Sequence, residues 1–140
     1  MNERDALIAG AQWDSELFRH AREFARADKI LVGAPYWDLS FPALLKVYLE
    51  NVFVCGVAFR YGEAGPVGLC AAKKLLYVTT SGGYIGDRDF GSEYLRGVCS
   101  MFGIPDFRAF RAEGLDIREL APDDILREAT ESVKEIARQW

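Results

Sequence analysis

The chain has 140 residues, of which 50% are hydrophobic and 13% aromatic, a composition typical of a protein with a buried core and not of a disordered one. Its formal net charge of −4, without any basic block, argues against nucleic-acid binding. No apolar run reaches membrane-spanning length and no signal peptide is apparent, so we expect a cytoplasmic protein with one domain over residues 1–140 and no membrane contact.

The pattern of apolar residues predicts helices that alternate with strands. Residues 1–12 show no clear period, and we expect an irregular lead-in there. The elements that follow are a helix over 14–27, a strand over 29–34, a helix capped by Ser40 and ending near Gly56, a hairpin over 57–66, a strand over 74–79, a helix over 93–102, a strand over 107–112 and a helix from Pro122 onward. Helices between successive strands predict an α/β fold with parallel strands and right-handed crossovers.

Two of the strands carry further information about their place in the sheet. The strand over 29–34 is apolar on both faces, which predicts that helices cover both. The strand over 107–112 contains Arg108 and Arg111, which favours a position at the edge of the sheet with both arginines solvated.

Cysteine and histidine, the usual carriers of metal or nucleophilic chemistry, are sparse. Cys55, Cys70 and Cys99 are odd in number and form no Cys-x-x-Cys motif, so we expect reduced, structural thiols. His20 is the only histidine and lies among charged residues of a predicted helix. We therefore name no metal ligand and no catalytic residue.

The most informative segment is the loop over 34–42, which directly follows a predicted strand. Ligands of open α/β sheets bind beyond the carboxyl ends of the strands. The loop offers two flat aromatic rings, Tyr36 and Trp37, with Asp38 and several backbone amides. Such a surface suits a planar, hydrogen-bonding heterocycle better than a sugar or a metal.

A second loop, over 80–84, follows the strand over 74–79 and contains Gly82 and Gly83. Because glycine has no side chain, the backbone amides of such a loop can approach a ligand closely. The loop is therefore the second candidate for ligand contact.

Several segments, in chain order, carry a resemblance to one family. They are 34–42, 44–52, 56–61, 65–69, 78–83 and 110–116. In these segments the chain resembles the flavodoxin-like FMN-dependent NAD(P)H oxidoreductases of the NADH-azoreductase and quinone-reductase group. The resemblance implies a flavodoxin-like, three-layer α/β/α fold with a truncated parallel sheet of about three core strands and a small hairpin excursion.

The resemblance also implies a set of cofactor-binding residues. One edge and one face of the FMN isoalloxazine ring would be wrapped by Pro35, Tyr36, Trp37, Asp38 and Leu39. The pyrimidine edge, where backbone amides can meet the negative charge of a reduced flavin, would be approached by Thr80, Ser81, Gly82 and Gly83. Asp38 departs from the family, which often has Asn there, and an acid does not favour an anionic flavin.

A substrate cavity is implied as well. Phe59 and Tyr61 fall where the dimer of the family lines the cavity of the neighbouring subunit, and we place Tyr84 in this cavity too. The resemblance implies NAD(P)H as co-substrate and a quinone, an azo compound or a similar flat, small aromatic acceptor, reduced by ping-pong hydride transfer. The alternative is a degenerate, non-catalytic module or half-domain subunit that binds a partner chain.

One departure affects both cofactor and assembly. The family begins with a strand, a Ser-rich loop and a helix N-terminus that hold the FMN phosphate, and the sequence has no match for that unit. We therefore expect weak FMN binding and an exposed apolar edge at the strand over 29–33. Such an edge predicts a homodimer; the alternatives are a separate chain that supplies the missing unit or a start codon further upstream.

Overall fold

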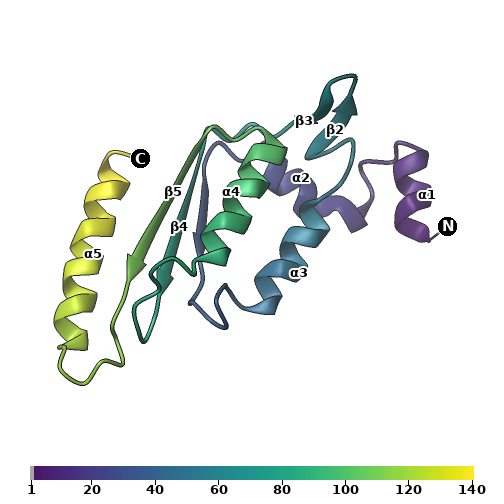
Figure 1. Ribbon diagram of the computed structural model, residues 1–140. Coiled ribbons are helices and arrows are strands. Elements are labelled where there is room, and N and C mark those ends of the chain that lie inside the picture. Colours follow the sequence, from purple (N-terminus) through teal and green to yellow (C-terminus); the bar gives the residue numbers. More distant parts are fainter. Residues whose placement is uncertain (1) are drawn as a thin grey trace.

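A computed structural model describes residues 2–140 and shows a parallel sheet flanked by helices (Figure 1). Its elements, in chain order, are α1 (Glu3–Ala9), the 3₁₀-helix η1 (Glu16–Phe18), α2 (Arg19–Arg26), β1 (Ile30–Gly33), α3 (Ala43–Val52), β2 (Phe59–Gly62), β3 (Gly65–Gly68), β4 (Lys74–Thr80), α4 (Phe90–Phe102), β5 (Asp106–Ala112) and α5 (Pro122–Arg138). Among these residues no helix is both long enough and apolar enough to cross a membrane.

The main sheet has the strand order β1-β4-β5, and both strand pairs are parallel. The expected α/β fold and the edge positions of β1 and β5 are therefore confirmed. β2 and β3 form a separate antiparallel hairpin, as predicted. In Figure 1 this hairpin lies near the end of α4, whereas the loops that follow β1 and β4 lie at the other end of the sheet, near the start of α4.

The side chains of β4 alternate between two layers of helices. Leu75 and Tyr77 are fully buried in the main core, to which α2, α3 and α4 contribute Phe24, Leu49, Val52, Leu95, Val98 and Phe102. Val78 and Thr80 belong to the opposite face and line a groove against α5. The sheet thus separates α5 from the other helices, which gives the three layers expected.

The prediction that helices cover both faces of β1 is wrong. Ile30 is buried, but Leu31 is 68% exposed. The reason is the position of α5, which packs against β5 at the far edge of the sheet. β1 is therefore an apolar edge strand with one open face.

The irregular lead-in predicted for residues 1–12 is also wrong, because α1 forms there. The side chain of Asn2 caps this helix by accepting a hydrogen bond from the amide of Asp5. The guanidinium group of Arg4 donates to the carbonyl oxygens of Glu50 and Phe53 at the end of α3. These contacts hold a helix that is too short to show a clear apolar period.

Two predicted helix starts need correction. The helix predicted over 14–27 is a 3₁₀ turn followed by α2, and the hydroxyl of Ser15 caps the turn at the amide of Leu17. Ser40 does not cap α3, since it exchanges backbone hydrogen bonds with Trp37 instead. The other two boundaries are as expected: α4 ends at Gly103, whose φ is 77°, and α5 begins with Pro122.

All three cysteines are free thiols. Burial raises the pKa of Cys70 to about 11 and the pKa of Cys99 to about 11. Both thiols therefore stay protonated in the folded protein at a pH where an unfolded thiol, with a pKa near 9, has ionised.

This difference predicts a loss of stability in alkaline solution. A raised pKa in the folded state means that the unfolded state binds fewer protons, so the free energy of unfolding should fall as the pH rises from about 9 to about 11. Urea unfolding at several pH values, on the wild type and on Cys70→Ala/Cys99→Ala, measures the contribution of the two thiols. The variant should lose less stability over this interval; equal losses would contradict the assignment.

Candidate functional site

The loop after β1 is fixed to the loop after β4 by backbone hydrogen bonds. The amide of Ala34 donates to the carbonyl of Val78 (3.1 Å), and the amide of Tyr36 donates to the carbonyl of Thr80 (2.8 Å). These bonds continue the parallel pairing of the two strands beyond the ends of the sheet. The carboxyl ends of β1 and β4 are therefore held side by side.

The loop then makes a tight turn. Trp37 and Ser40 donate to each other's carbonyl oxygens, each at 2.9 Å. The two residues between them have positive φ values, 49° for Asp38 and 72° for Leu39. A leucine in the left-handed region is strained and persists only where the surrounding structure holds it. The turn leaves the indole ring of Trp37 60% exposed.

The loop after β4 is held to the segment after β5. The amide of Asp116 donates to the carbonyl of Gly82 (2.9 Å), and the amide of Leu115 donates to that of Ser81 (3.1 Å). A Cβ at residue 82 would overlap the carboxylate of Asp116 as that side chain stands, so a larger residue there would require Asp116 to move. Among the described residues, the amides of Gly82 and Gly83 donate to no protein acceptor.

The two loops enclose one hollow of about 240 Å³ at the carboxyl ends of the strands. Of the predicted cofactor-binding residues, it is lined by Pro35, Tyr36, Trp37, Thr80, Ser81 and Gly82. Asp38 and Leu39 lie in the exposed turn, and Gly83 is exposed beside the hollow. The structure thus brings six of the nine predicted residues together.

The remaining predicted site residues do not share this hollow. Phe59 is buried in the main core against the rings of Phe53 and Phe102, whereas Tyr61 is 69% exposed on the hairpin. Tyr84 is exposed in the loop after Gly83. Within one chain, the hairpin lies toward one end of α4 and the loops after β1 and β4, whose residues line the hollow, lie toward the other end (Figure 1).

Leu115 and Asp116 line the hollow, although the sequence did not single them out as site residues. Both follow β5, so they stand at the carboxyl end of a third strand of the same sheet. Parallel strands bring their carboxyl ends to one edge of a sheet. Their position just after a predicted strand of the same sheet is the sequence signal from which Leu115 and Asp116 could have been predicted as site residues.

A family profile described as "Flavodoxin-like fold" matches residues 5–137. The chain belongs to the flavodoxin-like fold family.

Relatives by sequence are longer than this flavodoxin-like chain. It is 39% identical over 132 residues to the FMN-dependent NADH:quinone oxidoreductase 2 of Clostridium acetobutylicum, covering 91% of this chain and 66% of that protein. It is 40% identical over 124 residues to the FMN-dependent NADH:quinone oxidoreductase of Clostridium beijerinckii, covering 87% and 63%. The chain therefore spans slightly less than two thirds of these relatives.

Solved structures give the same fold. An FMN-dependent NADH-azoreductase from Bacillus anthracis, solved in complex with FMN, superimposes with a TM-score of 0.79 at 23% identity, covering 99% of this chain and 74% of that one. At this identity the likeness supports the flavodoxin-like fold alone.

The chemistry of the hollow can be compared with a flavin ring. The pyrimidine edge of isoalloxazine alternates carbonyl oxygens with an N–H group. The hollow offers the amide of Gly82 as a donor, Asp116 as an acceptor and the exposed Trp37 as a flat apolar surface, and the amide of Gly83 lies beside it. These residues fit one edge of the ring. Among residues 2–140 no three or more His, Cys, Asp or Glu side chains lie together so that they could hold a metal ion.

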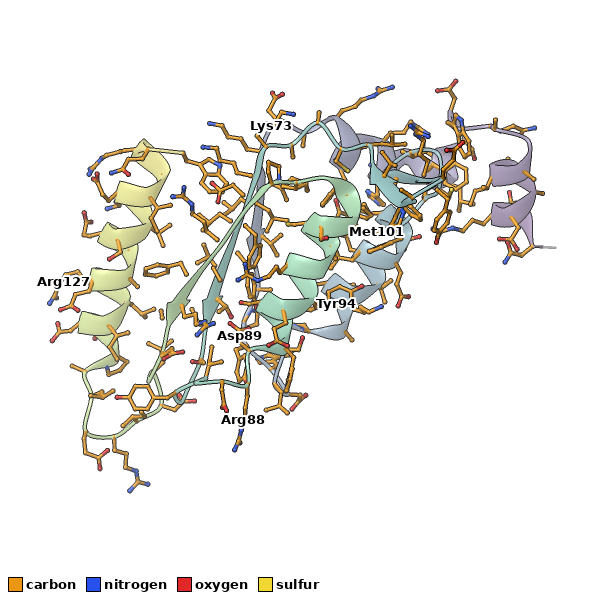
Figure 2. The ribbon with its side chains drawn as sticks, turned by 45° about the horizontal axis from the view of Figure 1, so that its top comes forward. Lys73, Arg88, Asp89, Tyr94, Met101 and Arg127 are labelled. Carbon is orange, nitrogen blue, oxygen red and sulfur yellow. The ribbon has the colours of Figure 1, made fainter. Side chains whose placement is uncertain are left out.

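The first residues of α4 and those just before it contact the loop after β1 and the strand β5. Asp89 caps this helix and forms an ion pair with Arg111 of β5, with 2.7 Å between the guanidinium nitrogen and Oδ2. The hydroxyl of Tyr36 donates to the carbonyl of Arg88 (3.1 Å). Figure 2 shows Arg88 and Asp89 at the site end of α4, whereas Met101 lies near the other end of the helix.

Proposed function

We propose that the chain binds FMN by its isoalloxazine ring at the hollow between its two loops and acts as an NAD(P)H oxidoreductase on quinones, azo compounds or similar flat acceptors. The observation that carries this proposal is the meeting in one hollow of Trp37 and Gly82, which are 45 positions apart in the sequence. When bound, FMN would supply hydride transfer, and we propose that NAD(P)H and the acceptor use the same site in turn, with ping-pong kinetics.

The residues of the chain have distinct parts in this proposal. The backbone from Pro35 to Leu39 orients one edge and one face of the ring, and Trp37 gives it an apolar contact. The free amides of Gly82 and Gly83 stabilise negative charge at the pyrimidine edge. Tyr84 and, from a neighbouring subunit, Tyr61 contact the acceptor.

A titration with FMN tests the proposal. Purified protein should be yellow or should gain thermal stability when FMN is added, and it should oxidise NADH or NADPH in the presence of a quinone. Colourless protein without a thermal shift at millimolar FMN would exclude this function.

Replacing Trp37 by alanine should weaken FMN binding by about 1–3 kcal/mol, the usual contribution of an aromatic ring stacked on a base. FMN fluorescence during titration measures this loss. Trp140→Ala is the matched control, since Trp140 contacts Lys74 through its ring and does not line the hollow. Equal affinities of wild type and Trp37→Ala would remove Trp37 from the binding site.

We also propose that the chain forms a homodimer, through the free edge of β1 or the helices beside it. Leu31 of β1 is 68% exposed and Leu44 of α3 is 79% exposed, so an apolar surface is open there. Light scattering at tens of micromolar should give twice the mass of one chain. A monomer at that concentration would contradict the proposal, and a stable complex with a different chain would favour the alternative partner.

One observation favours the second candidate, a non-catalytic module that binds a partner chain. The hollow of about 240 Å³ is smaller than the range of roughly 300–1,000 Å³ that is usual for ligand pockets. The FMN titration described above separates the two candidates.

A further inference from the structure

The strained turn of the first loop needs an external support, and the structure contains one. The carbonyl of Leu39 accepts a hydrogen bond from the amide of Phe90 (3.2 Å). Three residues back in this loop, the hydroxyl of Tyr36 donates to the carbonyl of Arg88 (3.1 Å). Residues 88 and 90, on either side of Asp89, therefore hold the loop at two points.

Asp89 is itself held by several bonds. Its Oδ1 accepts from the amide of Ser92 (2.8 Å), and its Oδ2 accepts from the hydroxyl of Ser92 (2.6 Å). The same Oδ2 forms an ion pair with a guanidinium nitrogen of Arg111 at 2.7 Å. The side chain of Asp89 is only 7% exposed. An acid at this depth needs a charged partner, because burial without one is costly.

Arg111 is the only side chain of the sheet that bonds to Asp89 among the described residues. Two hydroxyls of β4, those of Tyr77 and Thr79, are buried nearby without a hydrogen-bond partner of their own. Burial raises the pKa of Tyr77, and the charge of Asp89 adds to the rise, which is consistent with their proximity. In this structure the two hydroxyls therefore form no hydrogen bond with Asp89, and the positive charge beside it comes from Arg111.

We propose that Arg111 is a positioning residue for the flavin-binding loop: through Asp89 it fixes residues 88–90, which hold the turn that carries Trp37. That the loop binds a flavin rests on the proposed function; that Arg111 holds the loop rests on the contacts described here. It corrects the expectation that Arg111 is only a solvated edge residue, and it gives the ion pair a part in shaping the site.

The first test uses the protein without FMN and measures amide hydrogen exchange by NMR. In Arg111→Gln, exchange at Phe90 should accelerate roughly tenfold, because its acceptor at Leu39 is no longer held, whereas exchange at Leu95 in the same helix should not change. Arg111→Lys should restore part of the protection. The matched control is Arg108→Gln, on the same strand, whose arginine pairs with Asp106 at the opposite end of the sheet.

The second test measures FMN affinity in the same variants. Arg111→Gln should bind FMN roughly tenfold more weakly than the wild type, and Arg108→Gln should bind it equally well. If the wild type does not bind FMN, the proposed function fails, and the exchange data still decide whether Arg111 holds the loop.

Either of two results would overturn the proposal: unchanged exchange at Phe90 in Arg111→Gln, or equal acceleration at Phe90 and Leu95, which would indicate a general loss of stability. Should Arg111→Gln fail to fold, Asp89→Asn/Arg111→Gln removes both charges while an amide oxygen can still cap α4. This double variant should also lose protection at Phe90; full protection in it would contradict the proposal.

Discussion

Gly68→Ala is expected to lower the free energy of unfolding by about 3 kcal/mol, a large effect for one methyl group. Gly68 ends β3, and a side chain there would overlap the backbone of Phe102 and Gly103 at the end of α4. Backbone atoms cannot move aside as a flexible side chain can, so the hairpin and the helix would have to separate. Urea denaturation of the purified variant measures the loss.

Gly97→Ala is the matched control for this prediction. Gly97 lies on the exposed side of α4, and a side chain there would meet nothing within 4 Å. Alanine should raise the free energy of unfolding by about 0.5–1 kcal/mol, because it favours the helix over the unfolded chain. If both variants were equally stable, the close approach of β3 to α4 would be disproved.

Phe102→Ala should cost about 3–5 kcal/mol, the range for removing a buried aromatic ring. Phe102 is fully buried, and its ring contacts those of Phe24, Phe53 and Phe59, with centroids 5.7, 4.5 and 6.3 Å away. The ring therefore joins α2, the end of α3, the hairpin and α4. Because small domains are stable by only about 5–15 kcal/mol, thermal unfolding should occur well below that of the wild type.

Phe90→Ala is the matched control, because it also removes a phenylalanine from α4 but takes little buried packing with it. Phe90 begins α4 and is 50% exposed, so its truncation should cost less than about 1 kcal/mol. Phe102→Leu should lie between the two, since it keeps part of the buried volume. A Phe102→Ala variant as stable as Phe90→Ala would rule out the central place of Phe102 in the core.

Much of the fold was predictable because its signals are local. The apolar runs that became β1 and β4, the glycine that ends α4 and the proline that begins α5 each specify their element within a few residues. The two loops of the hollow were predictable for the same reason, since each directly follows a strand. Their meeting follows from the parallel order of the strands, which the alternation of helices and strands implies.

The parts that were not predictable depend on contacts between distant residues. Ser40 is a residue type that often caps helices, but here its backbone closes a turn with Trp37. The turn places Leu39 in the left-handed region, which leucine rarely adopts, so no local pattern predicts it. Asp116 enters the hollow only because its backbone pairs with Gly82. In the sequence, Arg111 looks like a solvated residue of an edge strand. Its ion pair forms because Asp89, just before α4, lies beside β5, and no local sequence pattern predicts that position.

The two edge strands of the sheet, β1 and β5, differ in charge. β5 carries Arg108 and Arg111, and charged side chains discourage an incoming strand. β1 reads Ile-Leu-Val-Gly and has no charge at all. If a further strand joins the sheet, from a second copy or from another polypeptide, we expect it beside β1 and not beside the arginines of β5.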